Sequence, residues 1–242
     1  MKKRVLTGFG KKGLALMLAG ILGGALLTGC GSQTGTTSDK GQAENQSTGS
    51  TTLTGGTQSA GQIAADNQEN EQAEELLSGK HHVEITIKDM GVIYVELDAD
   101  AAPITVTNFV KLAEEGFYDG LTFHRIIAGF MIQGGDPEGT GMGGSDNPIT
   151  GEFASNGIEN PLSHTRGAIS MARSSRPNSA SSQFFIVHED SLFLDGEYAA
   201  FGYVTEGMDI VDTICETTTG QDGNGIVPEE NRPVIESIKV VD

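Results

Sequence analysis

The 242-residue sequence contains no tryptophan, only two cysteines, and 15 lysine and arginine residues against 33 aspartate and glutamate residues. The resulting net charge of −18 argues against a nucleic-acid-binding protein, because contacts to phosphates need clustered basic side chains. Two cysteines can form neither a network of disulfides nor a cysteine-rich zinc site. The length suits one or two domains and supports a core of roughly 150 residues. The charge is distributed unevenly, and it divides the chain into three segments.

The first segment is a basic stretch followed by an apolar run. Residues 1–29 contain five basic residues and no acidic one, and residues 13–27 form an apolar run of 15 residues. This is the form of a secretory signal peptide, and the run is short for a spanning helix, which needs about 20 residues. It ends in residues 27–30 (LTGC), which resemble the lipobox of bacterial lipoproteins, where the cysteine is lipidated and becomes the first mature residue. The alternatives are an ordinary cleaved signal peptide and an uncleaved anchor.

Lipidation of Cys30 implies an extracytoplasmic protein anchored to a bacterial membrane, because a diacylated cysteine carries enough apolar surface for stable attachment. Without residues 1–29, the chain has 10 basic and 33 acidic residues, a net charge of −23. Anionic head groups repel such a protein. We therefore expect the lipid, and not surface charge, to hold it at the membrane.

The second segment, residues 30–79, is expected to be a flexible linker. Of the 49 residues from 31 to 79, 32 are glycine, serine, threonine, glutamine or asparagine, and none is aromatic. Such a composition cannot bury enough surface to offset the entropy of ordering, and random-coil scaling gives a span of roughly 35–45 Å. Within it, residues 66–77 could form a transient helix or, with weaker support, a coiled-coil partner helix.

The third segment, residues 80–242, has the pattern of a folded domain. Residues 82–87 and 92–97 alternate in polarity and predict a β-hairpin, and helices are expected at residues 103–115 and 208–215. Further short strands are expected at residues 122–127, 130–133, 168–171, 183–187, 200–204 and 234–241. About eight strands with two helices predict a mostly β fold, a closed eight-stranded antiparallel barrel with two capping helices.

Some local features suggest other functions but lack the required context. The glycine-rich residues 139–144 have no following lysine and helix, so they do not form a phosphate loop. Ser170 and His164 could join an aspartate in a hydrolase triad, but no G-x-S-x-G elbow is present. His81 and His82 face opposite sides of a strand, so we expect no metal site there.

Residues 123–136 (FHRIIAGFMIQGGD) resemble the signature of the cyclophilins, which are peptidyl-prolyl cis-trans isomerases. Further matching motifs follow in the same order at residues 139–141, 170–172, 182–186, 194–196, 201–202 and 206–208. The resemblance covers about residues 82–242. It implies a cyclophilin-like barrel with an isomerase domain at residues 80–242, acting as a monomer on proline-containing polypeptides.

The reaction implied by this resemblance needs no cofactor or metal. The barrier to rotation, roughly 18–20 kcal/mol, comes from amide resonance, and it falls when the prolyl nitrogen becomes pyramidal. Arg125 corresponds to the family's key residue, whose guanidinium can donate a hydrogen bond as resonance is lost. One such bond is worth roughly 1.5–3 kcal/mol, so binding and positioning must supply the rest. Gln133 matches the amide that orients this arginine.

The resemblance also implies a substrate pocket. The residues that match the receptor of the proline ring are Phe130, Met131, Phe185 and Leu194. Ala172 and Arg173 match the strand edge that pairs with the residue before proline, and Gln183 lies nearby. The alternative for Phe130, Met131 and Phe185 is plain barrel core, and the alternative for Arg125 is a surface salt bridge, but the surrounding motif favours the pocket and the catalytic role.

Three positions depart from the pattern of eukaryotic cyclophilins. Phe193 replaces a tryptophan, so the loss of the indole N–H should weaken binding of the inhibitor cyclosporin. Tyr198 replaces a histidine, which removes a titrating imidazole. Arg173 replaces an asparagine, and its charge suggests a preference for acidic residues before proline.

These features predict a lipid-anchored prolyl isomerase that assists the folding of exported or membrane-proximal proteins. A non-catalytic module that binds proline-containing peptides on the same barrel is the main alternative. A structural or adhesive surface lipoprotein is a second alternative, but it would not need the constellation around Arg125.

Overall fold

The computed structural model describes residues 75–242. The predicted signal peptide, Cys30 and nearly all of the predicted linker lie outside the described residues. Within the described part, neither helix has the length and apolar character needed to cross a membrane. The domain boundary expected at residue 80 coincides with the first residue of the first strand.

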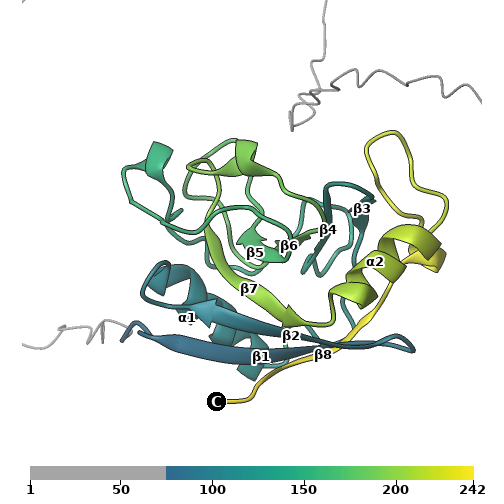
Figure 1. The fold of residues 1–242 in the computed structure, drawn as a ribbon, viewed down its shortest axis with the longest axis horizontal. Coiled ribbons are helices and arrows are strands. Elements are labelled where there is room, and N and C mark those ends of the chain that lie inside the picture. The colour runs from purple at the N-terminus through teal and green to yellow at the C-terminus, as the bar shows by residue number, and fades with distance from the viewer. Residues whose placement is uncertain (1–74) are drawn as a thin grey trace, which may run out of the picture. The chain divides into compact units, whose positions relative to one another are not determined.

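Eight antiparallel strands form one sheet in the order β3-β4-β6-β5-β7-β2-β1-β8. Their bounds are β1 (Lys80–Ile87), β2 (Gly91–Asp98), β3 (Arg125–Ile127), β4 (Met131–Gly134), β5 (Ala168–Met171), β6 (Phe184–Val187), β7 (Ala200–Glu206) and β8 (Ile235–Val240). In Figure 1, β1, β2 and β8 lie together in one half and β3 to β6 in the other. The long strand β7 joins the halves, because it pairs with both β2 and β5.

The sheet curls into a half-barrel, which corrects the prediction of a closed ring. The edge strands β3 and β8 do not pair with each other as strands. The segments that precede them are joined only by the bridge between Thr122 and Val234 and by a few backbone hydrogen bonds, such as that from Phe123 to Pro233. At three residues, β3 is also too short to offer a full ladder. The strand count and the antiparallel pairing are as predicted.

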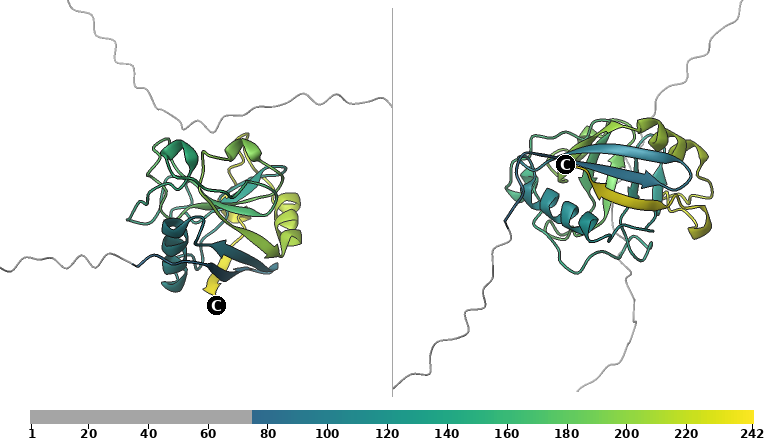
Figure 2. Two further views of the ribbon diagram at one scale, coloured as in Figure 1. Left: turned by 60° about the vertical axis from the view of Figure 1, so that its left-hand side comes forward. Right: turned by 90° about the horizontal axis from the view of Figure 1, so that it is seen from below.

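Two helices cover the sheet (Figure 2). Helix α1 (Pro103–Glu114) begins with a proline in its first turn, where the missing N–H costs no hydrogen bond. It buries the predicted face against β8 and β2, and Gly116 follows its end with a φ of 69°. Helix α2 (Met208–Thr217) is two residues longer than predicted and packs on β2. A short 3-10 turn at Leu192–Leu194 carries Phe193.

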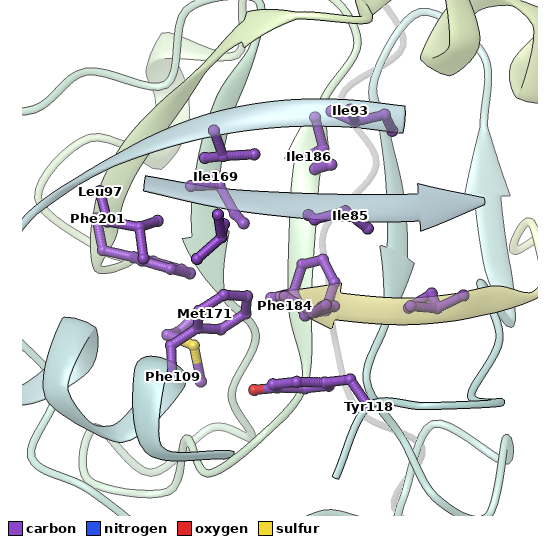
Figure 3. Close-up of a cluster of buried hydrophobic side chains, with 14 of the residues drawn as sticks. Ile85, Ile93, Leu97, Phe109, Tyr118, Ile169, Met171, Phe184, Ile186 and Phe201 are labelled. Carbon is purple, nitrogen blue, oxygen red and sulfur yellow. The ribbon is translucent and has the colours of Figure 1, made fainter. Parts of the chain in front are cut away.

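The main core lies inside the half-barrel and is rich in aromatic rings (Figure 3). Phe109 of α1 contacts Tyr118, Phe184 and Phe201, with ring centroids 5.0, 5.4 and 5.2 Å apart. Alternate residues of β1 and β2 complete it: Val83, Ile85, Ile87, Ile93, Val95 and Leu97. A second, smaller cluster of Met131, Ala168, Phe185, Val187 and Leu194 is separate from this core.

Candidate active site

A cavity of about 340 Å³, counted to its open mouth, lies on the outer side of the strands β3, β4, β5 and β6. It is lined by nine residues: Arg125, Phe130, Met131, Gln133, Ala172, Arg173, Phe185, Leu194 and Tyr198. All nine belong to the predicted site.

The register of three neighbouring strands explains why these residues meet. Arg125 of β3 lies opposite Gln133 of β4, which in turn lies opposite Phe185 of β6. Because side chains alternate along a strand, the adjacent row faces the interior. That row consists of Ile126, Ile132 and Ile186. The row of isoleucines therefore contributes to the core, and the row of Arg125, Gln133 and Phe185 forms the site.

The Arg125 guanidinium is held at the edge of the cavity by two hydrogen bonds. Nε donates to the carbonyl oxygen of Asn224 at 2.9 Å, and Nη1 donates to Gln133 Oε1 at 3.3 Å. Burial lowers the pKa of Arg125, although Tyr198 and Asp222 oppose this effect, and arginine remains charged. Within residues 75–242, Arg125 forms no ion pair, and no protein acceptor bonds to Nη2. The surface salt bridge considered as an alternative is therefore absent from the described part, and one donor is available to a ligand.

The floor of the cavity is apolar. Phe185 is 5% exposed and meets the ring of Tyr198 edge to face, with centroids 6.0 Å apart. Met131 and Leu194 are buried beside it, and Phe130 packs against this cluster. The predicted pocket residues thus pack in the smaller cluster and not in the main core.

A chain of hydrogen-bonded side chains, which runs from the exposed Asp195 to the buried His164 and Ser170, lies beside Phe185. His164 stacks on its ring, with centroids 6.0 Å apart, and Nδ1 lies 2.8 Å from Asp195 Oδ1. Its Nε2 lies 2.9 Å from Ser170 Oγ. This is the order of a hydrolase triad, but Ser170 and His164 are fully buried, so the hydroxyl cannot reach a substrate. Burial lowers the pKa of His164, and the neutral ring supports Phe185 from behind.

Arg173 is engaged within the protein. Its Nε and Nη2 donate to the carbonyl oxygen of Glu197 at 3.0 and 2.7 Å, and its Nη1 donates to that of Ser174 at 3.0 Å. The backbone N–H of Ala172 donates to the carbonyl oxygen of Gln183. These bonds limit what both residues can offer to a ligand.

Two predicted site residues do not line the cavity itself. Gln183 lies behind Gln133, which donates to it at 2.9 Å. Phe193 is 68% exposed beside the cavity, and its ring lies 5.6 Å from that of Phe130. Sequence reasoning missed Asn224, whose carbonyl holds Arg125. The only local signal was a turn-forming sequence at residues 222–225. Asn224, which lies in this turn, is 99 positions after Arg125 in the sequence.

Comparisons with known proteins agree with this fold and site. The family model described as "Cyclophilin type peptidyl-prolyl cis-trans isomerase/CLD" matches residues 82–240. Peptidyl-prolyl cis-trans isomerase B of Bacillus subtilis is 50% identical over 123 residues, which are 51% of this chain and 82% of that protein. A peptidyl-prolyl cis-trans isomerase of Helicobacter pylori is 50% identical over 132 residues, covering 53% and 78%.

A similar solved structure is that of a Cryptosporidium parvum cyclophilin type isomerase in the presence of the dipeptide Ala-Pro. Its TM-score is 0.59 and its identity is 32%, and the match covers 66% of this chain and 99% of that chain. The fold and these relatives together define a prolyl isomerase. The chain belongs to the cyclophilin-type peptidyl-prolyl cis-trans isomerase family, and its activity is peptidyl-prolyl cis-trans isomerisation.

Proposed function

We propose that the cavity binds the proline of an X-Pro bond and that Arg125 stabilises the twisted state of that bond. The observation that carries this proposal is the guanidinium, held through Nε and Nη1 beside an apolar floor, with Nη2 directed to no protein acceptor within residues 75–242. The Cryptosporidium enzyme was solved in the presence of Ala-Pro, which supports a proline-containing peptide as the ligand class.

The chemistry follows from the loss of amide resonance. As the C–N bond twists, the nitrogen lone pair becomes localised and accepts a hydrogen bond from Arg125 more readily than in the planar state. That bond is stronger in the transition state than in the ground state, which is the condition for catalysis. The apolar floor at Phe130, Met131 and Phe185 removes water from the polar planar amide. Gln133 fixes the orientation of the guanidinium.

A coupled prolyl-isomerisation assay tests this role. We expect Arg125→Ala to lower kcat/KM by roughly 10- to 150-fold, the value of one charge-assisted hydrogen bond. Arg176→Ala removes an exposed guanidinium outside the cavity lining and is the matched control. The mature chain with Cys30→Ser would be used to avoid lipid. Activity unaffected by Arg125→Ala would contradict the mechanism, and inactivity of the unmodified chain would favour a non-catalytic binding module.

We further propose that the enzyme is lipid-anchored and acts outside the cytoplasm as a monomer. The support is the sequence alone: the basic and apolar residues 1–29, the lipobox-like end at Cys30 and the polar linker to residue 79. Labelling with radioactive palmitate and fractionation of membranes test it. Cys30→Ser should abolish labelling and release the protein from the membrane fraction, whereas unchanged labelling would exclude this cysteine as the site.

The substrates are proposed to be other exported or membrane-proximal chains. All seven prolines of the sequence lie at or after Pro103, so the proposed linker contains no X-Pro bond. The linker therefore cannot be a substrate for its own domain, which leaves bonds of other proteins within its reach.

A further inference from the structure

The carboxylate of Asp136 organises the glycine-rich loop that follows β4. Asp136 is 1% exposed, and its Oδ1 accepts the backbone N–H of Glu138 at 2.8 Å. Its Oδ2 accepts the backbone N–H groups of Gly141 at 2.6 Å and Gly143 at 3.3 Å, and the Thr140 hydroxyl at 3.5 Å. Although burial opposes ionisation, these backbone donors hold the pKa of Asp136 below its ordinary value. A buried, ionised side chain thus fixes the path of the loop.

The close approach of the loop to this carboxylate requires glycine. A Cβ atom added to Gly143 would lie 2.2 Å from Asp136 Oδ1, and one added to Gly139 would meet Arg232. Gly141 adopts a φ of 82°. The position of the Gly143 carbonyl is therefore set by Asp136 and not by a side chain of its own.

From Gly143, an unbroken chain of hydrogen bonds runs to the Arg125 guanidinium. Gln183 Nε2 donates to the carbonyl oxygen of Gly143 at 2.7 Å. Gln133 Nε2 donates to Gln183 Oε1 at 2.9 Å. Arg125 Nη1 donates to Gln133 Oε1 at 3.3 Å. Two amide side chains therefore connect a backbone carbonyl to the guanidinium.

The carbonyl at one end and the guanidinium at the other demand the same direction of this chain. A carbonyl can only accept, so the amide nitrogen of Gln183 must face Gly143 and its oxygen must face Gln133. Gln133 must then turn its nitrogen to Gln183 and its oxygen to Arg125. A guanidinium can only donate, so the reverse orientation would place an amide N–H₂ against a cation.

We propose that Asp136 is a positioning residue of the isomerase: through Gly143 and Gln183 it fixes the amide orientation of Gln133, and thereby the direction of the Arg125 guanidinium. The proposal deepens the function proposed above and rests on the role of Arg125. Asp136 itself is buried and is not among the residues that line the cavity.

A double-mutant cycle separates this role from a purely structural one. Asp136→Asn weakens the hold on Gly143, which leaves the direction of Gln183 and Gln133 to be set by the Arg125 guanidinium alone. Gln183→Glu also removes the hydrogen bond to the Gly143 carbonyl, because a carboxylate cannot donate. It can still accept from Gln133 Nε2, so Gln133 keeps its orientation even when the loop at Gly143 moves. Gln183→Met removes the acceptor altogether. The readouts are kcat and KM of the mature chain, with its thermal midpoint measured in parallel.

We expect Asp136→Asn and Gln183→Met each to lower kcat/KM by roughly three- to tenfold, the range of one neutral hydrogen bond. Gln183→Glu should retain more activity than Gln183→Met. In the Gln183→Glu background, Asp136→Asn should lower the thermal midpoint as before yet leave kcat/KM unchanged. The control is Met142→Ala, which alters the same loop at a side chain that is 88% exposed.

Equal loss of activity from Asp136→Asn in both backgrounds, or no loss in the unmodified background, would overturn the proposal. If Asp136→Asn does not fold, Thr140→Val removes a donor to the same carboxylate and takes its place in the cycle. Arg125→Ala is assayed alongside. If Arg125→Ala retains full activity, the proposed function is wrong. If Arg125→Ala is impaired while Asp136→Asn has the same effect in both backgrounds, only the proposed role of Asp136 is wrong.

Discussion

The guanidinium of Arg173 lies over the ring of Tyr198, with its central carbon 4.6 Å from the ring centroid. The same carbon lies 4.9 Å from the centroid of Phe153. Its side chain is only 13% exposed, and its donors are bonded to carbonyl oxygens of Glu197 and Ser174. Arg173 therefore supports the cavity wall at Tyr198, and it presents little free charge to a substrate.

This arrangement changes the expected substrate preference. The sequence suggested that Arg173 favours acidic residues before proline, but a guanidinium with its donors already engaged gains little from a further carboxylate. We expect Glu-Pro and Lys-Pro peptides at high salt to be isomerised at rates within about fivefold of each other, because a screened charge contact is worth less than about 1 kcal/mol. A strong preference for Glu-Pro that disappears in Arg173→Met would contradict this expectation.

The same contacts predict that lysine cannot replace Arg173. Lys lacks the planar fork that bonds to two carbonyl groups and stacks between two rings. We expect Arg173→Lys to lower the free energy of unfolding by about 1–2 kcal/mol and to raise KM through movement of Tyr198. Denaturant unfolding and steady-state kinetics would measure both effects. Arg176→Lys, at an exposed position of the neighbouring loop, should change neither.

Catalysis should be nearly independent of pH in the range where the fold is stable. The group proposed to act on the twisted bond is an arginine, which stays charged although burial lowers its pKa. Tyr198 also stands where the eukaryotic cyclophilin pattern has a histidine. We expect kcat/KM to vary by less than about twofold from about pH 6.5 to about pH 8.5. A bell-shaped profile there would indicate a general acid or base and would refute the resonance mechanism.

Stability, in contrast, should fall as the pH is lowered through the range of histidine. His124 is 1% exposed, neither ring nitrogen has a hydrogen-bond partner within residues 75–242, and burial lowers the pKa of His124 to about 4. An unfolded histidine takes up a proton near pH 6.5, so between about pH 6.5 and 4 the unfolded state binds more protons than the folded state. The neutral His124 therefore contributes to the free energy of unfolding above about pH 6.5. This contribution, on the order of 3 kcal/mol in total, is lost as the pH falls to about 4.

Thermal midpoints measured across this range test the assignment. His124→Phe removes the buried imidazole and should flatten the dependence. His82→Gln is the control, because the His82 side chain is 52% exposed. An unchanged slope in His124→Phe would show that the acid lability comes from other groups, such as His164, whose pKa burial also lowers.

The sequence predicted the site residues through their resemblance to the cyclophilin signature, and alternation along single strands agrees with where the structure places them. The segment from Arg125 to Gln133 alternates between cavity and core, so its register could be read once the two strands were paired. The contact of Asn224 with Arg125 joins residues 99 positions apart and depends on how the half-barrel curls. The same curl leaves β3 and β8 as edges, which the strand count could not reveal. Ser170 and His164 were available in the sequence, but only their burial shows that they support Phe185 and do not react.

Phe193 gives a prediction about inhibition. Its ring is exposed and lies tilted against Phe130 at the side of the cavity, where it offers apolar surface but no hydrogen-bond donor. Because eukaryotic relatives have a tryptophan here, we expect cyclosporin to bind this enzyme weakly. Phe193→Trp should restore an indole N–H at the same place and tighten binding by roughly twofold to tenfold, the contribution of one neutral hydrogen bond.

Isothermal titration of the mature chain with cyclosporin would measure this change. Leu192→Trp is the matched control, because Leu192 is the neighbouring residue of the same 3-10 turn and is also exposed, at 56%. It adds an indole of equal size that is displaced from the ring of Phe130. If both variants tighten binding equally, added apolar surface is responsible and the indole donor is not. If Phe193→Trp has no effect, the weak binding comes from elsewhere in the site, with Tyr198 and Arg173 as the next positions to exchange.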